Sequence, residues 1–332
     1  MTPHLRGVPL GGWSIAIFVA VATAGLLYLM LKFAARLPMD VPNARSLHAR
    51  AIPRIGGVAM MLALLVASVL AWPPSPSLGV VIMCVAGVAM VSYFDDWRGL
   101  PVVPRLGAHL ALGAMAILLL GEPGPLGLVC LTLALVWTIN LFNFMDGSDG
   151  LAGGMALVGF LAYGMGALMG GDMELAFACL SVSAAALGFL VFNFPPARVF
   201  MGDAGSIPLG FLAGVFGYSG WLGQLWPAWF PVLVFSPFVV DASVTLSRRL
   251  LRRERIWQAH REHYYQRLVR MGWGHRRTAL AGYALMLSVG GGALLLLDSP
   301  ARVQWSGVAL WCAIYGFLLW RVDRAWHTYF KP

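Results

Sequence analysis

Charged residues are scarce in this chain: they make up 11% of its 332 residues, whereas hydrophobic residues make up 59%. So small a polar fraction excludes a soluble globular protein. Apolar runs of about 18 residues recur along the chain, and each can cross roughly 30 Å of hydrocarbon as a helix rising about 1.5 Å per residue. The sequence therefore predicts an all-α, polytopic membrane protein.

Several other features are missing from the sequence. It has no internal repeat, low-complexity tract or linker, which predicts one integral membrane domain over residues 1–332. It has neither a nucleotide-binding P-loop nor a motif for a covalent hydrolase, and no soluble module that would present basic residues to nucleic acid. The first apolar run has no small-residue cleavage pattern behind it, so we expect a retained span. The four cysteines stand singly in apolar runs and are interpreted as buried hydrophobic residues: Cys84, Cys130, Cys179 and Cys312.

Hydropathy predicts about eleven transmembrane helices, and the basic residues predict their orientation. If the N-terminus is periplasmic, all 23 lysines and arginines except Arg6 and Arg302 fall on the cytoplasmic side, which also places the C-terminus in the cytoplasm. The expected spans lie near 13–32, 55–72, 78–94, 106–120, 126–143, 151–170, 174–192, 207–222, 228–246, 278–297 and 304–320.

Five polar segments all fall on the predicted cytoplasmic side, whereas the outer connections are short. Polar loops that converge at one end of a bundle predict one composite site, and a basic inner face suits an anionic substrate or anionic lipid headgroups. The expected site loops lie near 33–54, 95–105, 143–150, 193–206 and 247–277.

The adjacent carboxylates Asp95 and Asp96 stand at the end of the third span. At an apolar rim two such charges repel one another unless a cation compensates, and a divalent metal or a metal-bound phosphate supplies that charge. The alternative is an interfacial pair of carboxylates neutralised by Arg98.

Asn140, Asn143, Asp146 and Asp149 stand three residues apart in "NLFNFMDGSDGLAGG". On one straight helix this spacing drifts around the axis, so the four side chains would not share a face. We expect a break at Gly147 that turns them toward a common cavity, because irregular backbone at membrane depth occurs where it lines one. Helix capping is the alternative.

Two further motifs allow two interpretations each. Asp203 in "MGDAGS" is a helix N-cap or a metal-ligating carboxylate beside a helix N-terminus that binds phosphate. "HREHYYQRL" is a solvated basic helix or a phosphate-binding segment that uses His260 and His263. Asp241, within the ninth span, is a site candidate or a partner of Arg248 or Arg249.

Six motifs in this order resemble one family. "DVPNARSLH", "PRIGG", "FDDWRGL", "NLFNFMDGSDGLAGG", "VFMGDAGSIPLGF" and "HREHYYQRL" are similar to the motifs of the polyprenyl-phosphate N-acetylhexosamine-1-phosphate transferases. This is the MraY/WecA-like superfamily, or glycosyltransferase family 4. The last motif looks like the WbpL-like branch that initiates O-antigen synthesis, since the peptidoglycan enzymes typically carry a run of histidines there.

The resemblance implies a reaction at the cytoplasmic face of the bacterial inner membrane. A UDP-N-acetylhexosamine and undecaprenyl phosphate would give undecaprenyl-pyrophosphoryl sugar and UMP, as the first step of O-antigen or other surface polysaccharide synthesis. Mg²⁺ would be the cofactor, with Mn²⁺ as a substitute, and a homodimer is compatible with this interpretation. Direct attack by the lipid phosphate and a phospho-aspartate intermediate both stay open, as does the identity of the sugar.

The resemblance also implies roles for individual residues. Asp203 would bind Mg²⁺, and Asp95 and Asp96 would be catalytic carboxylates that face the lipid phosphate. Phe200 would stack on uracil. The remaining candidates would contact substrate, with His263 also counted as catalytic: Asn143, Asp146, Gly147, Ser148, Asp149, His260, His263, Arg105 and Arg50.

Other functions remain as alternatives. The closest is a peptidoglycan-type or teichoic-acid-type lipid-linked precursor transferase. A secondary transporter would also carry carboxylates within its spans, but it is expected to place them near the midplane and often to show paired repeats.

Overall fold

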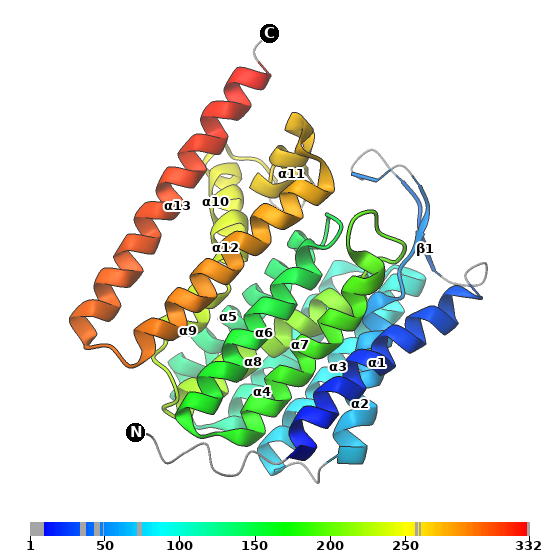
Figure 1. Ribbon diagram of the computed structural model, residues 1–332, viewed down its shortest axis with the longest axis vertical. Coiled ribbons are helices and arrows are strands. Elements are labelled where there is room, and N and C mark those ends of the chain that lie inside the picture. The colour runs from blue at the N-terminus through cyan, green and yellow to red at the C-terminus, as the bar shows by residue number, and fades with distance from the viewer. Residues whose placement is uncertain are drawn as a thin grey trace.

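The computed structural model describes residues 10–33, 38–42, 47–48, 50–71, 75–255, 258 and 260–330. Most of these residues are helical, and Figure 1 shows the helices side by side in one bundle. A short antiparallel pair of strands, β1 (Met39–Asp40) and β2 (Ile52–Pro53), lies at the upper end of that view, near the loops that follow α5 and α7.

The helices follow the expected segments closely. Their bounds are α1 (Leu10–Leu31), α2 (Gly56–Ala71), α3 (Pro76–Arg98), α4 (Val102–Leu120), α5 (Gly124–Met145), α6 (Leu151–Gly170), α7 (Met173–Asn193), α8 (Asp203–Leu222), α9 (Trp229–Val234), α10 (Ser236–Leu251), α11 (Tyr264–Leu268), α12 (Gly274–Leu297) and α13 (Ala301–Tyr329), with a π-helical turn at Val269–Trp273.

Within the described ranges, eight helical stretches are long and apolar enough to cross a membrane. This confirms the all-α, multi-pass membrane fold. The number of spans and their orientation stay predictions, since α2 is shorter than the usual span and the ninth expected segment is broken.

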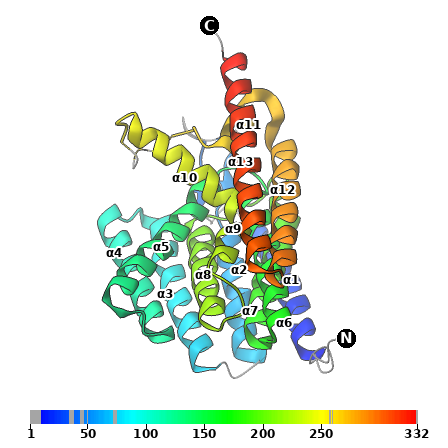
Figure 2. The ribbon, with the colours of Figure 1, turned by 90° about the vertical axis from the view of Figure 1, so that its left-hand side faces the viewer.

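The break in that ninth segment corrects the sequence prediction. One helix was expected over 228–246, but α9 ends at Val234 and α10 begins at Ser236, with Pro237 in its first turn. Proline lacks the backbone N–H that would continue the helix and its ring clashes with the preceding turn. Figure 2 shows α10 leaning away from the rest of the bundle as a result.

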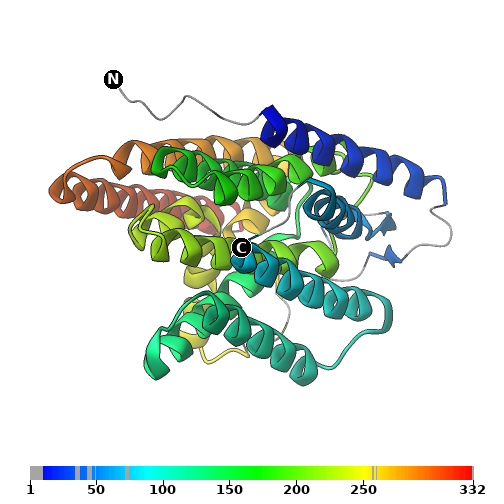
Figure 3. The ribbon, with the colours of Figure 1, turned by 90° about the horizontal axis from the view of Figure 1, so that it is seen from below.

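Helix α8 lies at the centre of the bundle and packs against α3 and α5. Figure 3 shows it with helices on both sides, and most of its residues are buried. On one side α7 packs against α1 and α6, and α12 packs against α6. Because α8 begins at Asp203, this buried helix carries the proposed metal ligand at its N-terminal end.

Local signals explain where α3 begins and ends. The Ser75 hydroxyl accepts a hydrogen bond from the Leu78 N–H at 3.2 Å, and Pro76 follows as the first helical residue, which is the favoured N-terminal pattern. Gly99 ends the helix with a φ of 67°, a left-handed conformation that glycine adopts without strain. The helix therefore stops just after Asp95 and Asp96, which places both carboxylates in its final turns.

Candidate functional site

Asp95 is held by groups from the α3–α4 connection. Its Oδ1 accepts the Leu100 N–H at 2.7 Å, and its Oδ2 accepts a hydrogen bond from Arg105 in the first turn of α4. The same Arg105 nitrogen lies 3.6 Å from Asp203 Oδ2. Arg105 therefore bridges two of the predicted catalytic carboxylates, and pairing of this acidic site with Arg98 is not what the structure shows.

Asp96 has a different role from its neighbour. Its Oδ2 accepts the Ala204 N–H at 2.9 Å, so a carboxylate from α3 caps the N-terminus of α8. Its side chain is 4% exposed, and Arg54 Nη1 lies 3.8 Å from Oδ1. The negative charge of Asp96 suits the positive end of the α8 dipole. At the α8 N-terminus, where phosphate was expected to bind, the Ala204 N–H is thus already bonded to Asp96, and phosphate binding there stays a prediction.

Asp203 is released from capping by this arrangement. Gly202 is the N-cap residue of α8, and the Asp203 side chain makes no cap bond. Instead its Oδ1 accepts a hydrogen bond from Asn143 Nδ2 at 2.8 Å, at the end of α5. The interpretation of Asp203 as an N-cap is therefore wrong, and its carboxylate is available for another partner.

Asp146 adds a fourth carboxylate beside these three. Within the described residues its side chain accepts no hydrogen bond, and burial together with the nearby Asp203 charge raises its pKa well above the usual value. We call this group the carboxylate cluster; its members are Asp95, Asp96, Asp146 and Asp203 with Asn143, Arg54 and Arg105. The cluster holds four carboxyl groups and only two arginines. Its positive charge is therefore smaller than the negative charge its carboxyl groups can carry, and a further cation can bind there.

The donor set fits Mg²⁺ in a particular way. Among the described residues, no three His, Cys, Asp or Glu side chains are arranged to hold a metal on their own. Mg²⁺ usually binds one or two carboxylates and takes its remaining ligands from water and substrate phosphates. Asp203, with its side chain 25% exposed, is the more accessible carboxylate beside Asp95 and fits that mode.

Two glycines bring α2 against the start of α8. A Cβ atom added to Gly57 would lie 2.1 Å from Gly205 N, and one added to Gly205 would lie 2.5 Å from Gly57 Cα. The N–H groups of Gly56 and Gly57 donate to the carbonyls of Phe200 and Met201 at 2.9 and 2.8 Å. The "PRIGG" motif thus fixes the loop that leads into Asp203.

The same loop is attached to the strand pair. Arg54 and Phe200 form a parallel β-bridge, and Arg54 Nη2 donates to Asp40 Oδ1 at 2.5 Å. The Phe200 ring is half-buried and packs edge-on against His48, with ring centroids 4.8 Å apart. Arg50 is exposed and makes no hydrogen bond or ion pair to another described residue. Part of the "DVPNARSLH" motif, residues 43–46, lies outside the described residues.

The chain breaks between α5 and α6 as predicted, but the polar residues there do not all meet. Asn140 donates to Val136 O within its own helix. Ser148 Oγ lies 3.0 Å from His275 Nδ1, and Asp149 Oδ2 accepts the Ala197 N–H at 3.0 Å. The expectation of one shared cavity is therefore wrong for Asn140, and neither Ser148 nor Asp149 contacts a member of the carboxylate cluster.

Gly147 connects this loop to α11. A Cβ atom added to Gly147 would lie 2.3 Å from the Tyr265 hydroxyl oxygen. That hydroxyl donates to Phe144 O at 3.1 Å. A side chain at position 147 would displace the Tyr265 hydroxyl, and the contact places the histidine segment next to the end of α5.

Asp241 organises the histidine segment. Its carboxylate accepts the backbone N–H groups of Tyr264 and Tyr265 at 2.9 and 3.0 Å, and His263 Nδ1 donates to it at 3.1 Å. His263 is 3% exposed, and its contact with Asp241 leaves Nε2 for a second partner. Since α11 is buried, the interpretation of "HREHYYQRL" as a solvated helix is wrong, as is pairing of Asp241 with Arg248 or Arg249.

His260 packs beside His263, with ring centroids 4.9 Å apart. Burial, followed by the neighbouring charges of His263 and Arg249, lowers the pKa of His260 to about 4. His260 is therefore neutral near pH 7 and would contact a ligand as a hydrogen-bonding group.

An apolar groove leads away from this end of the molecule. It has a volume of about 270 Å³ and runs between α5, α8 and the broken α9–α10 segment. Leu141 and Phe142 line it immediately before Asn143, and Phe238 and Val239 line it shortly before Asp241. Two parts of its lining are thus close in sequence to Asn143 of the carboxylate cluster and to Asp241.

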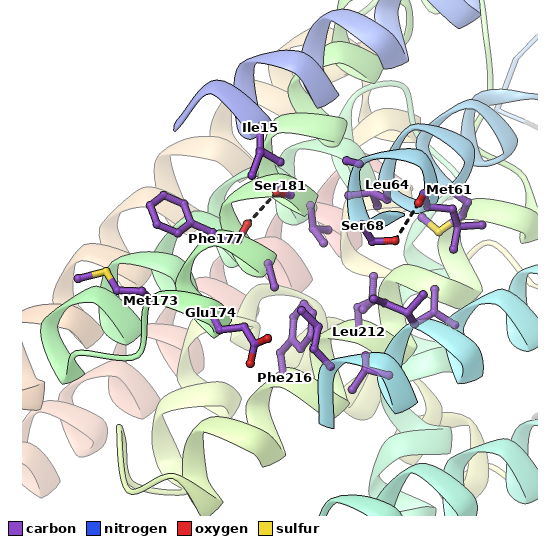
Figure 4. A pocket seen from close by; sticks show the side chains of 18 residues that line it. Ile15, Met61, Leu64, Ser68, Met173, Glu174, Phe177, Ser181, Leu212 and Phe216 are labelled. Atoms are coloured by element: carbon purple, nitrogen blue, oxygen red, sulfur yellow. Dashed lines mark hydrogen bonds between the residues drawn. The ribbon is translucent and has the colours of Figure 1, made fainter. Parts of the chain in front are cut away.

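A second apolar pocket lies elsewhere. Figure 4 shows it between α1, α2, α3, α7 and α8, with Glu174 as its carboxylate. Leu212 and Phe216 line it, roughly 14–20 Å along α8 from Asp203 at about 1.5 Å per residue. Glu174 Oε1 already accepts the Ser75 N–H at 2.9 Å. This pocket is separate from the polar site.

Comparisons of the sequence with known proteins identify the family of this chain. The model of glycosyl transferase family 4 matches residues 78–220. Phospho-N-acetylmuramoyl-pentapeptide-transferase of Moorella thermoacetica is 32% identical, covering 74% of this chain and 84% of its own. Decaprenyl-phosphate N-acetylglucosaminephosphotransferase of Mycolicibacterium smegmatis is 30% identical, covering 93% and 87%. The chain belongs to glycosyl transferase family 4. A third relative, undecaprenyl-phosphate alpha-N-acetylglucosaminyl 1-phosphate transferase of Yersinia pestis, is 28% identical over 93% of this chain and 92% of its own.

The match to glycosyl transferase family 4 covers the carboxylates but not the histidine segment. Residues 78–220 include α3, α5 and the start of α8, which supply Asp95, Asn143 and Asp203. Asp241 and His263 lie beyond it. They join the site through the contacts of α11 with the end of α5.

Two residues near the site were not identified from the sequence. Arg54 was counted among the cytoplasmic cations, but its place between Asp40 and Asp96 was not foreseen. His275 was not singled out, although it joins the start of α12 to Ser148 and, through Nε2, to Leu47 O at 3.2 Å. Arg54 lies within the "PRIGG" motif, which could have drawn attention to it. No motif near His275 indicated its contacts with Ser148 and Leu47.

Proposed function

We propose that this protein transfers an N-acetylhexosamine 1-phosphate from its UDP-activated form to undecaprenyl phosphate, releasing UMP. The observation that carries the proposal is the position of Asp203. Its carboxylate is held by Asn143, beside Arg105 and Asp95, and takes no part in capping its own helix. A site that must bring two phosphate groups together needs fixed cations, and a metal-ligating carboxylate can hold one.

The reaction exchanges one pyrophosphate bond for another. An oxygen of the lipid phosphate attacks the phosphorus attached to the sugar, a new P–O–P bond forms, and the old bond to the nucleotide phosphate breaks. UMP leaves with the oxygen of the broken bond. A phosphate monoester has a second pKa of about 6, so the lipid phosphate is largely dianionic near pH 7 and needs no general base. We therefore favour direct in-line attack over a phospho-aspartate intermediate.

The residues of the carboxylate cluster would have different roles in this reaction. Asp203, with Asn143 beside it, would hold Mg²⁺, or Mn²⁺ in its place. When bound, the metal would neutralise charge on the pyrophosphate oxygens. Arg105 would orient the attacking phosphate, and Asp95 would keep Arg105 in place. Asp96 would act chiefly by fixing the α8 N-terminus, so its role differs from the catalytic one first expected.

The two substrates would approach from different sides. The apolar groove lined by Leu141 and Phe142 suits the prenyl chain of the acceptor, because its lining is mostly apolar and includes the residues that precede Asn143. The donor would lie between the α7–α8 loop and the histidine segment. There Phe200 offers an aromatic ring for uracil, and His263 offers Nε2 for the pyrophosphate.

The site would face the cytoplasm of a bacterial inner membrane, where UDP-sugars are made. Two of the relatives carry N-acetylglucosamine transfer in their names and a third acts in phospho-N-acetylmuramoyl-pentapeptide transfer. The form of "HREHYYQRL" favours the branch that starts O-antigen or related surface polysaccharides, with a peptidoglycan-type or teichoic-acid-type precursor as the alternative.

A donor panel tests the proposal. The purified protein is incubated with undecaprenyl phosphate, Mg²⁺ and one UDP-sugar at a time, and released UMP is measured. We expect UMP with at least one UDP-N-acetylhexosamine and none when undecaprenyl phosphate is left out. A protein that transports these sugars would release no UMP with any donor, and that outcome would refute the proposal.

A further inference from the structure

Helix α13 is longer than a membrane span requires. Its apolar part was expected at 304–320, but the helix runs from Ala301 to Tyr329. At about 1.5 Å per residue, about 20 residues suffice to cross the hydrocarbon, so its last turns project beyond it. Figures 1 and 2 show this end rising past α12 to lie beside α11.

Asp323 joins this projecting end to α10 and α11. Its carboxylate lies 2.8 Å from Arg248 Nη1 and 2.9 Å from Arg267 Nη1, and it accepts a hydrogen bond from the Tyr264 hydroxyl at 3.2 Å. The side chains of Asp323 and Arg267 are only 20% and 10% exposed. Several charged hydrogen bonds on one partly buried carboxylate fix geometry better than a single exposed ion pair does.

Aromatic residues at the C-terminal end of α13 strengthen the same contact. The guanidinium of Arg270 lies 4.7 Å from the centre of the Trp326 ring and 5.6 Å from that of Phe330. Arg267 lies 5.6 Å from the Trp326 ring. Cation–π contacts are favourable at exposed cations such as Arg270 and stronger at desolvated ones such as Arg267. We call Asp323, Trp326 and Phe330 the α13 clamp.

The α13 clamp acts on the residues that carry the histidines. Arg267 Nε donates to Glu262 O at 2.8 Å, so the arginine held by Asp323 also holds the backbone beside His263. Asp241 on α10 accepts hydrogen bonds from His263 Nδ1 and from the N–H groups of Tyr264 and Tyr265. Segment 262–267 is thus held by two carboxylates, Asp241 on α10 and Asp323 on α13.

We propose that Asp323 is a positioning residue that sets His263 for the donor pyrophosphate through Arg267 and Tyr264. This inference rests on the proposed function for the identity of the ligand. Within the described residues Asp323 contacts no member of the carboxylate cluster, so its effect on the reaction passes through α11. The effect should therefore fall on the donor and spare the acceptor, whose phosphate and prenyl chain lie by Arg105 and the apolar groove.

The kinetic test compares Asp323→Asn with Asp298→Asn. Asparagine removes the charge that pairs with two arginines, while Asp298 lies at the other end of the same helix, in the α12–α13 connection. We expect Asp323→Asn to raise the donor KM about tenfold, with the acceptor KM within twofold of wild type. Asp298→Asn should change neither. Asp323→Glu, which retains the charge, should recover most of the donor KM.

A second measurement does not depend on transferase activity. Segment 248–277 is rich in arginines, so trypsin reports how well it is held in the folded protein. We expect trypsin to cut Asp323→Asn within this segment several-fold faster than wild type or Asp298→Asn.

The outcomes distinguish the positioning role of Asp323 from the proposed transferase function. An unchanged donor KM in Asp323→Asn overturns the positioning role, whatever trypsin shows. So does an equal rise in both KM values together with a lower melting temperature, which would indicate general support of the fold. If the wild-type protein transfers no sugar phosphate at all, the proposed function fails. Trypsin then decides whether Asp323 orders the segment: equal cleavage of variant and wild type refutes it.

Discussion

The carboxylate of Asp96 on α3 accepts the backbone N–H of Ala204 on α8 at 2.9 Å. This single bond connects two helices that are far apart in the sequence and provides the cap that Asp203 would otherwise supply. Adjacent aspartates on α3 therefore do different things: Asp95 holds Arg105, and Asp96 fixes the helix that presents Asp203. The structure separates a supporting carboxylate from one that is available to a metal.

Removing the cap at Asp96 should weaken the fold. Asp96→Ala loses the acceptor of the Ala204 N–H, and loss of an N-cap typically costs about 0.5–2 kcal/mol. Asp96→Asn keeps an oxygen that can accept the bond and should retain most of the stability. Melting temperatures of both variants in one detergent test this. An Asp96→Ala protein as stable as wild type would contradict the capping role.

A methyl group at Gly57 should disrupt the contact between α2 and α8. Its Cβ would lie 2.1 Å from Gly205 N, and backbone atoms cannot rotate away. We expect Gly57→Ala to lower the melting temperature and transfer activity together. Gly79→Ala is the control, because nothing lies within 4 Å of its Cβ and alanine is favoured over glycine in a helix by about 1 kcal/mol. Equal effects of the two substitutions would refute the close-approach argument.

Phe200 should affect the donor more than the acceptor. An aromatic ring stacked on a base is worth about 1–3 kcal/mol, so Phe200→Ala should raise the donor KM roughly 5- to 150-fold and leave the acceptor KM nearly unchanged. Phe317→Ala, in the middle of α13, serves as the control. Steady-state kinetics with each substrate varied in turn gives both constants. A change confined to the acceptor KM would remove Phe200 from the nucleotide site.

His260 should make the fold less stable in acid. Its pKa falls from about 6.5 to about 4 on folding, because burial and nearby cations disfavour the protonated ring. The unfolded chain then binds more protons than the folded one, so stability is full above about pH 6.5 and is lost as the pH falls toward 4. Between pH 7.5 and 5, the melting temperature of His260→Gln should fall less than that of wild type. Parallel curves would show that His260 titrates normally in the folded protein.

The helical segments could be predicted because apolar length alone defines them. The break before α10 and the extension of α13 could not be predicted in the same way. Ser236 and Pro237 were read within an apolar run, and the charges after Leu319 marked the end of the span without showing that the helix continues. The continued part carries Asp323, which meets Arg267 in a contact between distant parts of the chain.

The site residues could be gathered from sequence, but their partners could not. Motif spacing identified Asp95, Asp203 and His263 as candidates. It could not show that Asp96 caps α8 or that Asp241 binds His263, since each bond joins separate helices or loops. Polar residue types indicate what chemistry is available, whereas packing decides which of them remain free to do it.

The account depends above all on Asp203. Asparagine has nearly the same shape, and Asp203 caps no helix, so Asp203→Asn should fold and reach the membrane with a melting temperature close to that of wild type. A Mg²⁺ site needs the negative charge that the substitution removes. The decisive measurement is UMP release by purified Asp203→Asn, with saturating UDP-sugar, across a Mg²⁺ titration. We predict loss of nearly all activity, with no recovery from added donor; near-normal turnover with an unchanged Mg²⁺ requirement would contradict the account.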